Sequence, residues 1–206
     1  MIRLAVFLGN PGPKYAHNRH NAAWMLANVL PFSSSLNWEK KFGGLFSCSP
    51  SVGIHFLKPQ TYMNRSGGPA LAAAVFYKIK TEEIIVIHDE IELPFGTVSL
   101  KFSGGLGGHN GLRSMKACFG SVDFWRLRLG IGRPDGRIPG KGGSLEGFGI
   151  ADWVLSDFSP VEEEAFAVVL AAGADLLLQA IEDDPDKLLP QWGRKNILEK
   201  QDNIHI

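Results

Sequence analysis

The sequence predicts a single α/β domain built on a mixed, partly parallel and twisted sheet flanked by helices. Short apolar runs typical of buried strands alternate along the chain with stretches that have helical spacing, a pattern that favours this class. The chain has 206 residues, a length within the range of one large domain. No internal repeat or linker divides it. We expect one domain over residues 1–190 and a C-terminal tail of unknown role at 191–206.

The first half of the chain begins with an apolar run at residues 4–8. This run stops at Asn10-Pro11-Gly12, which predicts a strand followed by a turn. Residues 21–30 have helical spacing and stop at Pro31. Beyond them we expect a hairpin on either side of Ser49-Pro50-Ser51 (42–48 and 52–58), a helix of small residues (69–78) and a buried strand (84–88).

The second half contains two segments, 98–102 and 125–131, whose polarity alternates as in half-buried strands. A glycine-rich turn between them leads into an expected helix at 110–118. Ser159 then begins a long helix, because it is followed by proline at the first helical position and by Glu162 in place for a capping box. This helix is expected to end near Pro185. Residues 133–149 are rich in glycine and basic residues and are predicted to form a mobile loop.

The composition excludes several classes of protein. Two cysteines cannot form a disulfide framework or a four-thiolate zinc site. Glycine makes up 24 of the 206 residues, or about 12%, whereas the average is about 7%. This excess implies several sharp turns or close approaches of the backbone to a ligand. No apolar run reaches the roughly 18 residues of a membrane span, and the first strand runs on without a cleavage-like signal. We therefore expect a cytoplasmic protein that does not enter a membrane.

The charge is balanced overall but divided along the chain. Residues 1–150 hold 17 basic and 9 acidic residues, a net charge of +8, whereas residues 151–206 hold 4 and 12, a net charge of −8. A basic body can attract a polyanion even when the total charge cancels. The alternative is that these charges only solvate helix surfaces.

Familiar cofactor and nucleophile motifs are absent. A dinucleotide fingerprint starting at Gly105 would need glycine where Asn110 stands. No phosphate-binding P-loop occurs, and no glycine-x-serine-x-glycine elbow. A nucleotide cofactor and a serine nucleophile are therefore unsupported.

Polar residues follow or begin the predicted elements at one edge of the sheet. The carboxyl ends of strands in an open α/β sheet form the usual binding crevice, so these side chains are expected to converge. A histidine beside a carboxylate can act as a general base on water, and asparagine amides can bind a developing oxyanion. The candidates are Asn10, His20, Asn64, Asp89, His109 and Asn110.

A zinc site is the alternative interpretation of the histidines. His17 and His20 lie three residues apart, and with Asp89 or His109 they could supply a set of ligands. Against this, the interval between His17 and His20 spans an expected loop-to-helix junction, and asparagine is a poor zinc ligand. Each candidate could also be an ordinary capping, turn or solvated residue.

Six short blocks resemble the bacterial peptidyl-tRNA hydrolase family. They occur in the family's order and extend from the N-terminus to about Arg133. The blocks are Leu8-Gly9-Asn10-Pro11-Gly12-x-x-Tyr15, Arg19-His20-Asn21, Lys58-Pro59-x-Thr61-Tyr62-Met63-Asn64-x-Ser66-Gly67, His88-Asp89-Glu90-x-x-Leu93-Pro94-x-Gly96, Gly104-Gly105-x-Gly107-Gly108-His109-Asn110-Gly111-Leu112-Arg113 and Arg126-Leu127-Arg128-x-Gly130-Ile131-Gly132.

The resemblance implies a monomeric enzyme that hydrolyses the ester between a peptide and the 3′ end of tRNA, without metal or cofactor. It implies that His20 is the base, that Asp89 orients it, and that Asn10 distinguishes N-blocked from free aminoacyl-tRNA. The resemblance also implies substrate or tRNA contacts at Tyr15, Tyr62, Met63, Asn64, His109, Asn110, Arg113, Lys101 and Arg128, the last two with acceptor-stem phosphates. The alternative is a module of the same fold that binds RNA without turnover.

Overall fold

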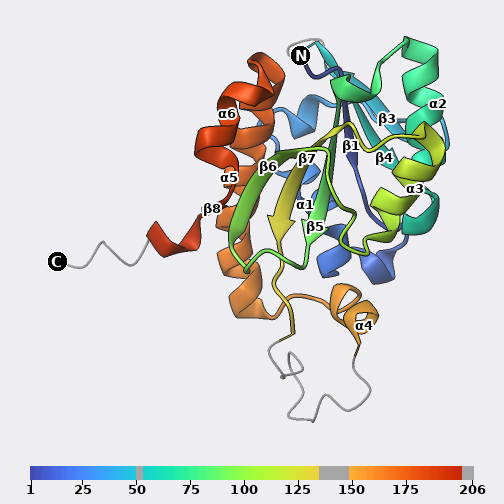
Figure 1. Cartoon of the computed structure of the whole chain (residues 1–206). Coiled ribbons are helices and arrows are strands. Elements are labelled where there is room, and N and C mark those ends of the chain that lie inside the picture. Colours follow the sequence, from blue (N-terminus) through green and yellow to red (C-terminus); the bar gives the residue numbers. More distant parts are fainter. Residues whose placement is uncertain (50–52, 135–148, 201–206) are drawn as a thin grey trace.

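The computed structural model describes residues 1–49, 53–134 and 149–200, and its centre is an eight-stranded sheet. The strand order is β2-β3-β4-β1-β5-β7-β6-β8 (Figure 1). The four central strands β4, β1, β5 and β7 are parallel, and the remaining pairs are antiparallel. This confirms the predicted mixed sheet. The strands are β1 (Leu4–Phe7), β2 (Glu39–Lys41), β3 (Gly44–Ser49), β4 (Ile54–Pro59), β5 (Ile84–Glu90), β6 (Thr97–Phe102), β7 (Trp125–Gly130) and β8 (Lys195–Asn196).

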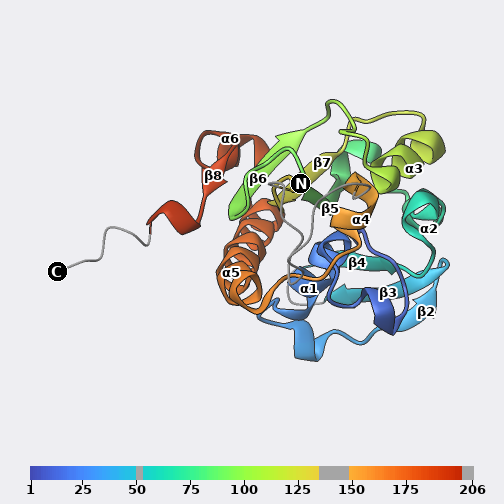
Figure 2. The same ribbon diagram turned by 90° about the horizontal axis from the view of Figure 1, so that it is seen from below.

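Helices cover both faces of the sheet. Figures 1 and 2 show α5 and α6 on one side and α2 and α3 on the other. The α-helices are α1 (Ala22–Asn28), α2 (Gly67–Tyr77), α3 (Asn110–Phe119), α4 (Ile150–Val154), α5 (Pro160–Glu182) and α6 (Pro185–Trp192). Short 3-10 turns lie at Pro13–Tyr15, Arg19–Asn21, Ser33–Ser35, Met63–Arg65, Thr81–Glu83 and Leu198–Lys200.

The two faces of the sheet bury two hydrophobic cores, because successive side chains of a strand point to opposite sides. On β1, Ala5 and Phe7 belong to the core beneath α1 and α5, whereas Leu4 and Val6 belong to the core beneath α2 and α3. The helices α2 and α3 pack closely at Gly67, where an added Cβ would lie 2.2 Å from the carbonyl oxygen of Ser114. The strand β1 is buried on both sides and is apolar throughout.

By length and composition α5 is apolar enough to cross a membrane, but half of its most apolar window is buried inside the domain. Its buried side chains, such as Phe166, Val169 and Leu177, belong to the same core as α1 and β7. Burial in this core accounts for the apolar character of the helix. Its N-terminus is the predicted one, with a capping box between Ser159 and Glu162.

The C-terminal region contains structure that the sequence reasoning did not predict. The long helix ends at Glu182, and a separate helix, α6, starts at Pro185 with Asp184 as its N-cap. Beyond it, β8 pairs with β6, and the hydroxyl of Ser99 donates to the carbonyl oxygen of Gly193. The edge strand β2 and the short α4 were not predicted either. The expected loop at 133–149 lies outside the described residues from 135 to 148.

Candidate active site

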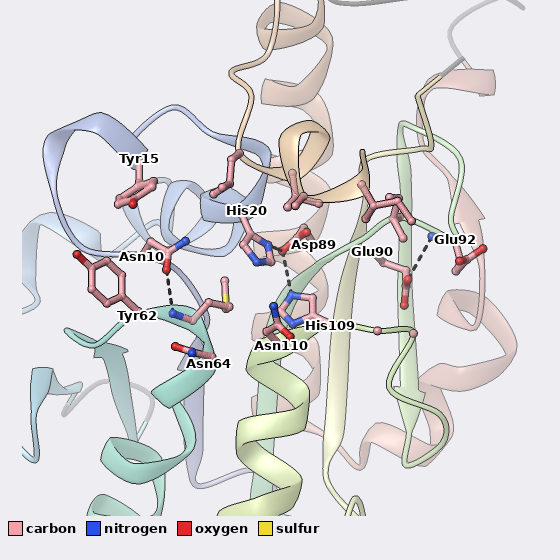
Figure 3. A pocket seen from close by; sticks show the side chains of 18 of the residues that line it. Asn10, Tyr15, His20, Tyr62, Asn64, Asp89, Glu90, Glu92, His109 and Asn110 are labelled. Carbon is pink, nitrogen blue, oxygen red and sulfur yellow. Dashed lines mark hydrogen bonds and ion pairs between the residues drawn. The ribbon is translucent and has the colours of Figure 1, made fainter. Parts of the chain in front are cut away.

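A pocket of about 540 Å³ opens at the carboxyl edge of the parallel strands (Figure 3). Nine of the twelve residues singled out from the sequence line it, so the expected convergence is found in the structure. Lys101, Arg113 and Arg128 do not line it. The nine are Asn10, Tyr15, His20, Tyr62, Met63, Asn64, Asp89, His109 and Asn110.

The floor of the pocket is formed by His20, Asp89 and His109, and we call these three residues the pocket floor. His20 lies in the 3-10 turn before α1, Asp89 near the end of β5, and His109 at the start of α3. Both histidines contact the same carboxylate oxygen: Asp89 Oδ1 is 2.8 Å from His20 Nδ1 and 3.1 Å from His109 Nε2 (Figure 3). Asp89 is 3% exposed, so this carboxylate depends on the two rings rather than on water for its hydrogen bonds.

The pKa values on the pocket floor follow from burial and from this pairing. Burial raises the pKa of the Asp89 carboxyl, but the two imidazoles outweigh burial and hold that pKa well below its usual range. Burial lowers the pKa of His20, but the Asp89 carboxylate outweighs it and leaves that pKa above its ordinary value. The carboxylate is therefore ionised at neutral pH and can only accept hydrogen bonds.

Of the two ring nitrogens of His20, Nε2 is the one that is available to accept a proton. An ionised carboxylate requires a donor, so the Nδ1 of His20 carries the proton and the Nε2 presents its lone pair. Among the described residues Nε2 has no hydrogen-bond partner, and it is not sealed from solvent. This ring can therefore accept a proton from a water molecule in the pocket.

Asn10 is held in one orientation by its neighbours. Its Oδ1 accepts a hydrogen bond of 2.8 Å from the backbone N–H of Met63. Its own backbone forms two hydrogen bonds with the side chain of Asn21, at 2.8 and 3.0 Å. Because the side-chain oxygen is occupied, the amide that remains for a ligand is the donor Nδ2, which has no partner among the described residues.

Arg19 fixes the position of His20 and was assigned no role from the sequence. It is fully buried, forms two bonds of 2.7 and 2.8 Å to the carboxylate of Glu162, and lies over the ring of Trp153. It also donates to the hydroxyl of Ser156 at 2.8 Å. The residue before the candidate base is thereby tied to the start of α5. Its place in Arg19-His20-Asn21 was the signal that could have marked it.

Arg126 has a similar task for the glycine turn that precedes His109. It is buried, and its guanidinium donates to the carbonyl oxygens of Gly104 and Gly105 at 2.7 and 2.6 Å. These bonds fix the start of the glycine turn that leads to His109. The sequence placed Arg126 on the same strand face as Arg128, and the strand register confirms this, but its charge is turned toward backbone carbonyls.

The rim of the pocket is more exposed than its floor. Tyr62 is 59% exposed, and Asn64 and Asn110 are exposed, whereas Tyr15 is partly buried and Met63 is buried. Arg113, one turn further along α3, is exposed and donates to Asn110 Oδ1 at 3.5 Å. The exposed side chains of Tyr62, Asn64 and Asn110 are therefore open to a ligand that enters the pocket.

Lys101 and Arg128 lie beside the pocket, on neighbouring strands. Lys101 on β6 is paired directly with Arg126 on β7, and Ser99 is paired with Arg128, so the side chains share one face. Arg128 donates to Ser99 Oγ at 2.6 Å and lies 3.9 Å from Glu90, which lines the pocket. We call Lys101, Arg126 and Arg128 the cationic face.

The pocket floor also offers a set of metal-ligand atoms. One atom each of His20, Asp89 and His109 lies within 4.8 Å of the others, a donor set that zinc accepts. An ion would have to replace both hydrogen bonds to Asp89. The predicted alternative set with His17 is not assembled, because His17 is exposed and lies 3.8 Å from Glu163.

The fold and the site define an α/β protein whose pocket contains a buried carboxylate between two histidines and, among the described pocket residues, no serine or cysteine. Comparison with known proteins agrees with this class. Residues 4–200 match the family model described as Peptidyl-tRNA hydrolase. A peptidyl-tRNA hydrolase of Treponema pallidum (strain Nichols) is 46% identical over 207 residues, which cover 96% of this chain and 97% of that protein.

Solved structures give the same result. A single-site mutant of peptidyl-tRNA hydrolase from Acinetobacter baumannii has a TM-score of 0.80 at 31% identity and covers 93% of this chain and 94% of its own. Another structure of the Acinetobacter baumannii enzyme has a TM-score of 0.74 at 34% identity, with coverage of 92% and 91%. The chain belongs to the peptidyl-tRNA hydrolase family.

Proposed function

We propose that this protein hydrolyses the ester bond between a peptide, or an N-blocked amino acid, and the 3′ end of tRNA, which recycles free tRNA. The observation that carries the proposal is the carboxylate of Asp89, which accepts from two histidines and leaves the Nε2 of His20 unpaired in the pocket. Family membership supplies the substrate class.

In the proposed reaction His20 is the general base. Its Nε2 takes a proton from water as the water oxygen forms a bond to the ester carbonyl carbon. The bond between this carbon and the ribose 3′ oxygen then breaks, and the imidazolium returns the proton to that oxygen. The products are a peptide carboxylic acid, which ionises, and tRNA with a free 3′ hydroxyl. Asp89 stabilises the imidazolium that exists between the two proton transfers.

Three asparagines are proposed to recognise the substrate. Because the Oδ1 of Asn10 is occupied by the Met63 N–H, its Nδ2 would donate to a carbonyl oxygen of the peptidyl group. A free aminoacyl ester offers an ammonium group instead, which cannot accept that bond. Asn64 and Asn110 on the rim would hold the carbonyl, the attacking water or the tRNA end, together with Tyr15, Tyr62 and Met63.

The tRNA is proposed to bind mainly through phosphates. Lys101 and Arg128 of the cationic face, with Arg113 on α3, supply positive groups beside the pocket, and phosphate contacts suit an enzyme that accepts many tRNAs because they read no base. We further propose that the protein acts as a cytoplasmic monomer and that the reaction needs neither metal nor cofactor, since a base, an orienting carboxylate and amide donors are all side chains.

Release of free tRNA from N-acetylated aminoacyl-tRNA tests this function. The full chain should release tRNA, and His20→Ala should release it far more slowly. His17→Ala is the matched control, because His17 is an exposed histidine that does not line the pocket. Tight binding of the substrate without release by the wild-type chain would contradict the proposal and favour a module that binds RNA without turnover. Activity that persists after treatment with a chelator would support metal independence.

A further inference from the structure

His109 is the N-cap of α3, and this contact determines where its ring carries a proton. The Nδ1 accepts from the backbone N–H groups of Gly111 and Leu112 at 3.1 and 3.4 Å. A backbone N–H can only donate, so Nδ1 must present its lone pair. In the neutral ring the proton therefore lies on Nε2, which is 3.1 Å from Asp89 Oδ1.

The local backbone allows the ring to occupy this position because residue 111 is glycine. A Cβ added there would lie 2.7 Å from the Met63 sulfur and 3.1 Å from Cε1 of His109. A side chain at Gly111 would therefore displace the cap ring or the pocket wall. The first turn of α3 and the tautomer of His109 are fixed by the same packing.

The same oxygen of Asp89 then receives two N–H groups. His109 donates from Nε2 and His20 donates from Nδ1, at 3.1 and 2.8 Å. Two donors on one oxygen stabilise the ionised form and oppose rotation of the carboxylate. With Asp89 fixed, His20 has one orientation and presents Nε2 to the pocket.

The bare nitrogens of the neighbouring rings differ in their surroundings. The titratable groups facing His109 are His20, His88 and Asp89, and Tyr15, Tyr62, Glu90, Glu92 and Arg133 line the same pocket. A second proton on His109 would point at two backbone N–H groups. His88 is fully buried, and burial holds its pKa well below its ordinary value. Of these three rings, His20 alone has a bare nitrogen that is neither capped nor buried: Nδ1 of His109 accepts two backbone N–H groups, and Nε2 of His88 is buried without a partner among the described residues.

We propose that His109 is a positioning residue: its cap of α3 locks the ring in the Nε2–H tautomer, and that N–H holds the Asp89 carboxylate in place for His20. This rests on the proposed function, because the task belongs to the same reaction. It differs from the substrate contact that the family resemblance implies for this residue.

The variant His109→Asn removes the N–H donor to Asp89 while it keeps an N-cap for α3. Asparagine is a favoured N-cap, so its Oδ1 can replace the ring nitrogen at Gly111 and Leu112, but the shorter side chain cannot also reach Asp89. We expect kcat to fall by about tenfold with little change in KM and in Tm. The acid limb of the kcat profile should move up by roughly half a pH unit to one unit, because Asp89 then shares its charge with His20 alone and stabilises the imidazolium more.

Two further variants complete the comparison. His109→Ala removes both contacts and should lower kcat as His109→Asn does, with an additional fall in Tm from the lost cap. Asp184→Ala is the matched control, since Asp184 caps α6 through the N–H of Asp186 at 3.1 Å and lies outside the pocket. It should lower Tm and leave kcat and its acid limb unchanged.

Ring-nitrogen NMR of the full ¹⁵N-labelled chain tests the tautomer without any substrate. His109 should show a bare Nδ1 and a protonated Nε2, and His20 the reverse. A protonated Nδ1 on neutral His109 would overturn the proposal. The proposal would also fail if His109→Asn kept the wild-type kcat and acid limb, because His109 would then act only as a helix cap. A raised KM with no other change would overturn it as well, because that result would indicate a substrate contact. If the wild-type chain released no tRNA, the proposed function would fail while the NMR result still decided the tautomer.

Discussion

The pocket floor and the cationic face lie side by side. The charge of the floor is compensated within it, whereas most of the positive charge of the cationic face is not. On the floor, one carboxylate is matched by two histidine N–H groups, and the three side chains are at most 10% exposed. On the cationic face, three cations have one carboxylate, Glu90, near them at 3.9 Å from Arg128. Lys101 forms no hydrogen bond or ion pair among the described residues.

The difference indicates what each region is suited to. A balanced, buried set can pass a proton without changing its partners, which is what general base catalysis requires. An unbalanced set of cations retains a positive potential that a polyanion can neutralise. Arg126 strengthens this contrast, because its two terminal nitrogens donate to backbone carbonyls, which carry no full negative charge. Changes on the floor should therefore affect turnover, and changes on the cationic face should affect binding.

The largest effect is expected from His20→Ala. Without the ring the pocket loses the bare imidazole nitrogen that is proposed to take the proton from water, and kcat should fall by on the order of 10²–10⁴. Steady-state hydrolysis of an N-acetylated aminoacyl-tRNA measures this, with circular dichroism to confirm folding. A folded variant with near wild-type turnover would show that the base lies elsewhere.

Asp89→Asn should have the next largest effect and should change the pH profile. Both histidines donate to one oxygen, so the asparagine carbonyl can keep both bonds while the charge is lost. The carboxylate is what raises the pKa of His20 against burial. Its removal should lower that pKa, move the acid limb down by roughly one to three pH units and reduce kcat by about 10²-fold.

The control for this variant is its thermal stability, which should stay near that of the wild type because the hydrogen bonds are retained. An acid limb that does not move would show that Asp89 does not determine the protonation of the base. The opposite directions expected for Asp89→Asn and His109→Asn make the two variants a paired test of the pocket floor.

A smaller and more selective effect is expected from Asn10→Asp. The new carboxylate can still accept the Met63 N–H, so the local fold is kept, but the donor toward the substrate becomes an acceptor. Activity on N-acetylated substrate should fall relative to free aminoacyl-tRNA, with the ratio changing by about 10- to 100-fold. Parallel assays on the two substrates measure it. An unchanged ratio with a lower Tm would mean that Asn10 only shapes the turn.

Most of the fold could be predicted because its signals are local. The apolar runs of β1 and β5, and the alternation of Trp125, Leu127 and Leu129 with the arginines of β7, mark buried strands directly. The strand β2 escaped prediction because Glu39–Lys41 is a charged edge strand, and β8 because two residues carry no periodicity. The helix α6 could have been found, since Asp184-Pro185 repeats the cap-then-proline signal of Ser159-Pro160.

The residues of the candidate site could be predicted from the sequence, but the hydrogen bonds between them could not. Strand ends in a parallel sheet meet at one edge, which is why Asn10, Asn64 and Asp89 could be grouped. That one oxygen of Asp89 serves two histidines depends on contacts 69 and 20 residues apart in the chain. The buried contact of Arg19 with Glu162 spans 143 residues, and no local pattern indicates its partner.

The smallest effect on turnover, and the sharpest contrast with the pocket floor, is expected on the cationic face. Lys101→Ala and Arg128→Ala should each raise KM for peptidyl-tRNA several-fold and reduce the slope of log affinity against log salt by about one. Lys187→Ala is the matched control, because it removes the same charge from an exposed lysine of α6 that is paired with Asp183, and we expect no tRNA contact there. A minimal N-acetylated ester without the acceptor stem should be hydrolysed as fast by Lys101→Ala and Arg128→Ala as by the wild type, since it has no phosphates to lose. Arg128→Ala also frees Glu90 from its cation, so Lys101→Ala gives the cleaner measurement. Equal losses on the full and the minimal substrate would place these residues in the catalytic machinery and remove the division between the two regions.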